Sequence, residues 1–154
     1  MIGIKEIKER GINTWNKLWN LNGQEEIETP INESIAFELK YKKILIGILV
    51  LENGIWTFEY SEEFKNQDIL APLTDFPQLE KIYKSNSLYP FFLIRIPSLK
   101  QPKVQQEIKE HDIDERNAVD LLKFFGHRTI ANPFLLYYYY YLHSNLHQLH
   151  LWLE

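Results

Sequence analysis

Between residues 35 and 60 the hydrophobic and polar positions follow the two-residue period of β-strands. Residues 35–41 alternate apolar and polar side chains, as a half-buried strand does. Residues 44–51 are apolar at nearly every position, and residues 55–60 form a β-branched and aromatic run. Glu52-Asn53-Gly54 joins these two segments, and Asn and Gly tolerate the positive φ angles of a tight hairpin turn. The pattern predicts a small antiparallel meander that contains this hairpin.

After residue 60 the pattern changes to short helical segments. Residues 61–64 predict one helical turn, with Ser61 as its N-cap and acidic residues at its positive end. Ser87 is the expected N-cap of a second short helix, because Pro90 then falls in the first turn, where a missing N–H costs little. Pro97 would end that helix.

Two further helices and a strand are predicted before residue 134. Residues 102–111 have Val104 and Ile108 at i,i+4 spacing, which indicates an apolar helix face. Asp114 is the expected N-cap of the next helix, and Gly126 is its expected stop. Residues 130–134 are expected to form a final strand. A meander followed by helices favours the α+β fold class.

The two ends of the chain differ from this central part. Apolar residues recur at broadly helical spacing between residues 4 and 19, which predicts one broken helix or two short ones, followed by an acidic connector. We therefore divide the chain into a helical extension and connector over 1–34, a main domain over 35–134, and an atypical tail over 135–154. The tail is rich in Tyr and His. It is either native or the stump of a truncated second domain, left by an altered reading frame.

Composition narrows the functional classes. The chain has 154 residues, 45% of them hydrophobic, enough for one compact core. The net charge is −4, and no basic run extends beyond Lys42-Lys43, so direct nucleic-acid binding is not expected. Cysteine is absent, which excludes disulfides and cysteine nucleophiles. The start does not resemble a secretory signal, and no apolar run reaches the roughly 20 residues of a membrane span, so a cytoplasmic location without membrane contact is expected.

Candidate chemistry is sparse. His143, His147 and His150 would share one face of a helix and could ligate zinc, but the alternative is an incidental histidine-rich tail. The carboxylates between Asp112 and Asp120 suit helix caps better than acid–base catalysis. Phosphate-binding and kinase motifs are absent from the sequence. We therefore expect no catalytic residue, no cofactor and no enzyme activity.

An aromatic cluster between residues 89 and 95 is the best candidate for a partner-binding surface. Its members could not all face one core from a short helix, so some would remain free to dock a partner. The alternative is that most belong to the core. The candidate residues are Tyr89, Phe91, Phe92 and Arg95.

The order of motifs resembles the N-terminal subdomain of HipA-type toxin kinases. A GxL hairpin, an F-x-Y strand, a P-L segment and an FF segment closed by proline occur in that order within residues 45–97. Later in the chain, a basic helix, an Asp-Leu-Leu segment, a Phe-Gly and a closing strand follow between residues 108 and 130. The resemblance covers roughly residues 37–134.

The resemblance implies a small α+β module that caps a kinase lobe, and the catalytic motifs of that lobe are absent here. In split HipBST systems, a separate HipS protein resembles this subdomain and acts as an antitoxin by binding the HipT kinase. The implied function is a non-catalytic module that docks on and restrains a HipA-like or HipT-like serine/threonine kinase. A HipB-like DNA-binding protein is a second implied partner. The alternative is the N-terminal module of a truncated multidomain protein whose lost C-terminal domain handled nucleic acid.

Overall fold

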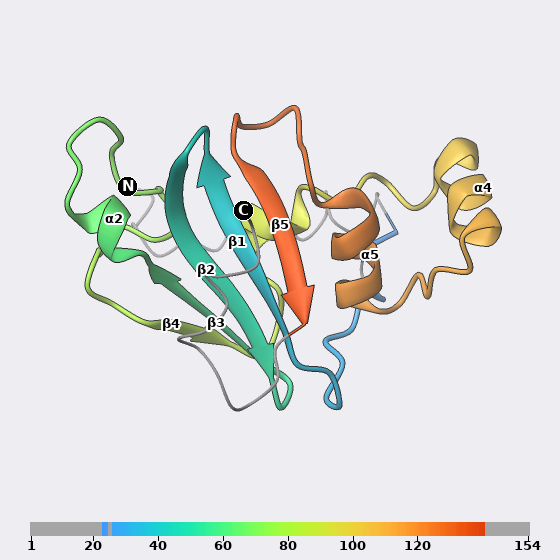
Figure 1. The fold of residues 1–154 in the computed structure, drawn as a ribbon. Helices are drawn as coiled ribbons and strands as arrows, with labels where there is room; N and C mark the ends of the chain where they lie inside the picture. Colours follow the sequence, from blue (N-terminus) through green and yellow to red (C-terminus); the bar gives the residue numbers. More distant parts are fainter. Residues whose placement is uncertain (1–22, 25, 141–154) are drawn as a thin grey trace, which may run out of the picture.

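The computed structural model describes residues 23–24 and 26–140, and these form an α+β fold (Figure 1). A five-stranded sheet has the order β4-β3-β2-β1-β5, and every neighbouring pair is antiparallel. Its strands are β1 (Ile35–Tyr41), β2 (Ile44–Glu52), β3 (Ile55–Tyr60), β4 (Tyr83–Ser85) and β5 (Leu135–Tyr140). The helices are α2 (Glu62–Lys65), α3 (Pro90–Leu93), α4 (Pro102–Glu110) and α5 (Ala118–Phe125). The predicted fold class is confirmed.

The hairpin forms as its sequence predicts. Asn53 and Gly54 have φ angles of 50° and 75°, the left-handed values that a two-residue hairpin turn requires. Gly47 in β2 has a different reason to be glycine, because a Cβ there would lie 2.7 Å from the Phe58 ring on β3. The same Cβ would lie 2.5 Å from the Glu59 carbonyl oxygen, so glycine at this position is a packing requirement of the β2–β3 pair.

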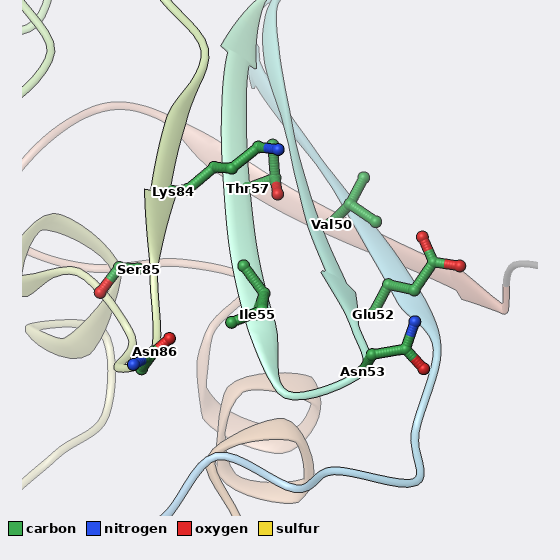
Figure 2. Close-up of a pocket in the computed structure, with 8 residues that line it drawn as sticks. All are labelled: Val50, Glu52, Asn53, Ile55, Thr57, Lys84, Ser85 and Asn86. Carbon is green, nitrogen blue, oxygen red and sulfur yellow. The ribbon is translucent and has the colours of Figure 1, made fainter.

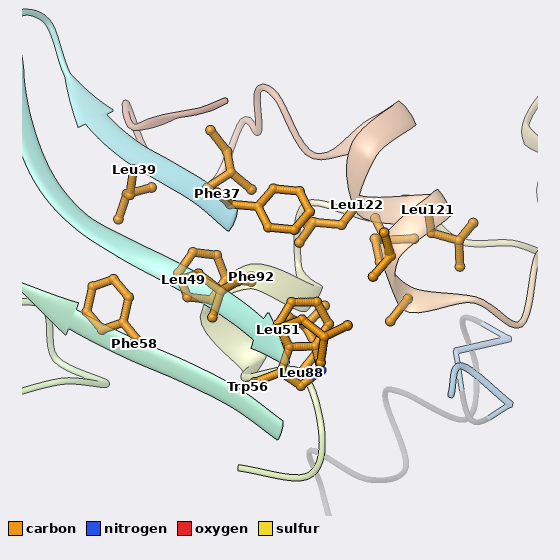
Figure 3. Close-up of a cluster of buried hydrophobic side chains, with 14 of the residues drawn as sticks. Phe37, Leu39, Leu49, Leu51, Trp56, Phe58, Leu88, Phe92, Leu121 and Leu122 are labelled. Atoms are coloured by element: carbon orange, nitrogen blue, oxygen red, sulfur yellow. The ribbon is translucent and has the colours of Figure 1, made fainter. Parts of the chain in front are cut away.

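One face of the sheet carries the core. Phe37, Leu49, Leu51, Trp56 and Phe58 alternate inward from β1, β2 and β3 and are at most 1% exposed (Figure 3). Helices α3 and α5 supply the facing side chains. Those are Phe92, Ala118, Val119, Leu121 and Leu122.

The ends of the helices confirm the predicted N-cap at Ser61 and the predicted stop of α5 at Gly126, and they correct two predicted N-caps. Ser61 caps α2, and its hydroxyl accepts a hydrogen bond of 3.0 Å from the Phe64 amide. The prediction of Ser87 as a cap was wrong, because α3 begins after Tyr89 with Pro90 in its first turn, while the Ser87 amide donates to Ser85. The prediction of Asp114 was also wrong. Asn117 caps α5 instead, and its Oδ1 accepts from two amides at 2.8 and 3.2 Å.

The last strand also lies later than predicted. Residues 130–134 form no strand, and β5 begins at Leu135, where the sequence predicted the tail to begin. His127 fixes this start, because its carbonyl accepts from the Leu136 amide at 3.0 Å and its Nδ1 lies 3.0 Å from the Leu136 carbonyl oxygen. The predicted helices of residues 4–19 and the histidines of the tail lie outside the described residues.

Tyr60 ties β3 to the long loop that precedes β4. Its hydroxyl donates to the Phe76 carbonyl at 2.6 Å and accepts from the Leu73 amide at 2.8 Å. Burial raises the pKa of Tyr60 from its ordinary value of 10 to about 12. Because the folded pKa is the higher one, this group stabilises the fold fully below pH 10, and the contribution is lost as pH rises through 12.

Replacing Tyr60 by phenylalanine should therefore lower the free energy of unfolding by about 1–3 kcal/mol, because it leaves the Leu73 amide and the Phe76 carbonyl unpaired. Urea unfolding of both proteins at neutral pH measures this difference. The gap between them should shrink as the pH rises above 10, since only the wild type loses the Tyr60 contribution. A gap that stays constant up to pH 12 would show that Tyr60 titrates normally.

Candidate protein-docking surface

The aromatic cluster around α3 is mostly core in the described structure. Phe92 is fully buried, with its ring centroid 5.7 Å from that of Phe58. Tyr89 and Phe91 are half-buried and pack edge-on against the Phe76 ring at 5.1 and 6.0 Å. Burial raises the pKa of Tyr89 to about 12. Only Tyr89 and Phe91 of the predicted aromatic residues therefore present part of a ring to solvent, and their partner-binding role stays a prediction.

Arg95 is buried without an acidic partner among the described residues. It is 3% exposed, and its guanidinium donates to the Gly126 carbonyl at 3.0 Å, the Asn132 Oδ1 at 3.1 Å and the Phe134 carbonyl at 3.1 Å. Burial lowers its pKa to about 10, so the side chain is still a cation at neutral pH. Arg95 thus joins α3 to the segment between α5 and β5, and its predicted contact with a partner stays untested.

A different surface carries exposed aromatic rings, where α5 meets β5. Phe124 is 39% exposed, Tyr138 47% and Tyr140 63%. The His111 ring, at the end of α4, lies 4.7 Å from that of Phe124, and the rings of Tyr138 and Tyr140 are 6.3 Å apart. We call this set the α5–β5 aromatic surface. It consists of His111, Lys123, Phe124, Tyr138 and Tyr140.

Lys123 organises the tyrosine half of this surface. Its Nζ donates to the Tyr140 hydroxyl at 2.6 Å and lies 5.1 and 5.6 Å from the ring centroids of Tyr140 and Tyr138. Burial alone would lower the pKa of Lys123, but the Tyr140 hydrogen bond and the Asp120 carboxylate at 4.0 Å raise it above its ordinary value. The ammonium is therefore firmly charged and holds two tyrosine rings in place.

A pocket of about 320 Å³ opens on this surface. Its aromatic lining comes from Phe124, Tyr138 and the ring of His111, and its charged lining from Asp112, Asp120 and Lys123. Strand β5 is also an edge of the sheet, so the aromatic surface continues onto an edge rather than onto another strand of the described fold. Partly exposed aromatic rings beside a few charges are typical of protein-binding surfaces.

The opposite face of the sheet has a larger depression of about 570 Å³ (Figure 2). Thr57 and Lys84 are cross-strand partners on β3 and β4, and Val50 and Ile55 line the same hollow. The Ser85 hydroxyl, at the end of β4, donates to the Ser87 carbonyl at 2.7 Å, which ties the strand to the loop that follows it.

Metal chemistry finds no support in residues 23–24 and 26–140. No group of three or more His, Cys, Asp or Glu side chains in this part of the chain is placed to hold an ion. The histidines of the predicted zinc site, His143, His147 and His150, fall beyond these residues. No helix among the described residues is long and apolar enough to cross a membrane.

Sequence reasoning missed the α5–β5 aromatic surface because it treated the consecutive tyrosines as a tail without periodicity. In a strand, alternate side chains point to opposite faces. Residues 136, 138 and 140 therefore share the face that meets α5, and a strand reading of residues 135–140 would have placed two tyrosines beside Lys123. What places residues 135–140 in the sheet is the pairing of β5 with β1, and no local sequence pattern reveals that pairing.

Comparison with known proteins agrees with this fold. No curated protein sequence matches the chain significantly. The family model of the HipA N-terminal domain matches residues 37–131, which span β1 to the loop after α5. In HipA proteins this domain is a non-catalytic subdomain, and the family belongs to toxin–antitoxin systems. The chain belongs to the HipA N-terminal domain family.

Proposed function

We propose that this chain is a non-catalytic binding module that docks on a HipA-like or HipT-like serine/threonine kinase and restrains it. Family membership supports the toxin–antitoxin context. The observation that carries the docking role is the α5–β5 aromatic surface, where Phe124, Tyr138 and Tyr140 expose large parts of their rings. Exposed tyrosine and phenylalanine beside a charged rim are what a protein partner buries at the centre of an interface.

The surrounding structure favours docking as a rigid body. Phe124 lies on α5, whose inward residues Leu121 and Leu122 are at most 1% exposed. Tyr138 stands on β5 opposite Phe37, with ring centroids 6.2 Å apart. Because both aromatic residues project from elements held by the core, little conformational entropy is lost when a partner covers them. Such a module would act in the cytoplasm beside its kinase.

Purification of the tagged chain from its own cells tests the proposal. The expected result is a HipA-like or HipT-like kinase recovered in near-equal amount, with or without a HipB-like DNA-binding protein. Activity of that kinase on a generic substrate should fall when the chain is added. Recovery of the chain without any kinase would overturn the proposal and favour the alternative of an N-terminal module of a larger protein.

The purified chain alone should neither hydrolyse ATP nor phosphorylate itself, because its sequence holds no residues that position phosphate and magnesium. Incubation with radiolabelled ATP and magnesium measures both reactions. A catalytically competent kinase in the same buffer is the positive control. Label incorporated at a rate that follows the chain through two chromatographic steps would contradict the non-catalytic role.

A further inference from the structure

The pocket on the α5–β5 aromatic surface has one carboxylate without a compensating charge. Asp120 lies 4.0 Å from the Lys123 ammonium, so these two charges largely offset each other. The exposed side chain of Asp112 has neither an ion pair nor a hydrogen bond with another described residue. Among Asp112, Asp120 and Lys123, which all line the pocket, the carboxylates therefore outnumber the ammonium group by one.

The side chains of the neighbouring segment are also mostly negative. Residues 107–115 carry five carboxylates and a single lysine. His111 lies 4.0 Å from one of these carboxylates, that of Glu107. Of these carboxylates Asp112 lines the pocket itself, and charges nearer to one another than one Debye length, about 8 Å at physiological ionic strength, are only weakly screened. An approaching cation is attracted and an approaching anion is repelled.

The walls of the pocket also suit a cation. Phe124 on α5 and Tyr138 on β5 both line it, and the His111 ring lies tilted against that of Phe124 with the centroids 4.7 Å apart. Ring faces attract ammonium and guanidinium groups, and on the same surface Lys123 already lies 5.6 Å from the Tyr138 ring. A planar guanidinium can stack on a ring and pair with a carboxylate at once, which an ammonium does less well.

We infer that this pocket receives an arginine side chain from the partner, with Asp112 pairing the guanidinium and the Phe124 and Tyr138 rings flanking it. This inference rests on the proposed function and names the chemistry of the partner's contact. The pocket volume of about 320 Å³ is large enough for one long side chain. The remaining aromatic surface around it, Tyr140 included, would bury against apolar parts of the same partner.

The variant Asp112→Asn tests the charge and changes little else. Asparagine keeps the shape of the side chain and tolerates the φ angle of 50° at this position. Affinity for the kinase recovered with the chain should fall about tenfold, and the loss should be smaller at 0.5 M salt. The matched control is Asp68→Asn, an exposed aspartate in the loop after α2, which lies at the opposite end of the molecule from α4 (Figure 1).

The variant Phe124→Leu tests the ring, since leucine keeps an apolar side chain but has no ring face. It should also weaken kinase binding several-fold. If Asp112→Asn and Phe124→Leu both bind the kinase as tightly as wild type does, the arginine pocket is wrong while the docking module stands. If both variants bind the kinase more weakly than wild type does while Asp68→Asn binds it normally, the result supports the arginine pocket.

A small probe decides the inference even if no kinase is recovered. Acetyl-arginine-amide titrated into the ¹⁵N-labelled chain should shift the backbone amides of residues 111–113 and 123–124 in a saturable way. Acetyl-lysine-amide should shift them less, and acetyl-glutamate-amide should leave them unchanged. Shifts that are absent, that spread over all acidic residues, or that persist in Asp112→Asn would overturn the arginine pocket.

Discussion

Replacing Phe58 by alanine should lower the free energy of unfolding by about 3–5 kcal/mol, as for large buried aromatic residues generally. Phe58 is fully buried on the central part of β3 (Figure 3). Its ring centroid lies 4.3 Å from that of Phe76 and 5.7 Å from that of Phe92, so it joins the sheet to α3 and to the loop before β4. Alanine leaves a cavity that three separate segments would have to close.

Trp56 lies two residues earlier on the same face of β3. Replacing it by alanine should lower the free energy of unfolding by a similar amount. It is also fully buried, and its Nε1 donates to the Thr29 hydroxyl at 2.9 Å, which ties the segment before β1 to the sheet. Thr57→Ala is the matched control, because Thr57 points to the other face and strand propensity alone spans about 1 kcal/mol. Chemical unfolding followed by circular dichroism measures all three variants. An unchanged unfolding midpoint for Phe58→Ala and Trp56→Ala would contradict the placement of these two side chains in the core.

The sheet could be predicted because local and tertiary signals agree there. Alternation fixed which residues of β1 and β3 face inward, and Asn53-Gly54 fixed the turn with its positive φ angles. The turn at Lys42 carries a φ of 53° as well, although lysine gives no such signal. There the short link between β1 and β2 imposes the conformation, and the side chain tolerates it.

The misplaced caps show the limit of reasoning from single positions. Asp114 and Asn117 are both suitable N-caps, and only the packing of the α5 apolar face selects between them. Beginning α5 after Asn117 brings Ala118 and Val119 into the core and lets the Ala118 amide donate to the Glu28 carbonyl at 3.0 Å. Asp114 instead accepts from the Arg116 amide in the preceding turn.

The candidate site depends still more on distant contacts. Residues 135–140 carry no turn residue and no alternation of apolar with polar side chains, so their period could not be read from the sequence. Pairing with β1 sets Tyr138 opposite Phe37 and leaves Tyr140 beside Lys123. Only the assembled fold shows that Tyr138 lines one pocket with His111, although the whole of α5 separates the two residues in the sequence.

Arg95→Leu is expected to destabilise the fold by about 3 kcal/mol, close to the loss for a core aromatic residue. Leucine fills much of the space but leaves the Gly126 and Phe134 carbonyls without the Arg95 donor, while the Asn132 Oδ1 keeps only its hydrogen bond from the Phe134 amide. Charged hydrogen bonds contribute about 1.5–3 kcal/mol each, and the cost of burying the cation offsets part of that sum. Thermal and urea unfolding measure the loss.

Two further variants separate the fork geometry of Arg95 from its charge. Arg95→Lys keeps the charge but cannot reach three acceptors at once, so it should lose about half as much stability as the leucine variant. Arg128→Leu removes an exposed arginine from the loop between α5 and β5 and should change the free energy of unfolding by less than about 0.5 kcal/mol. Full stability in Arg95→Leu would mean that the three contacts are dispensable. If Arg95→Leu is less stable, the conformation of the segment between α5 and β5 depends on Arg95. Kinase binding through the α5–β5 aromatic surface should then weaken in the same variant, although Arg95 is not part of that surface.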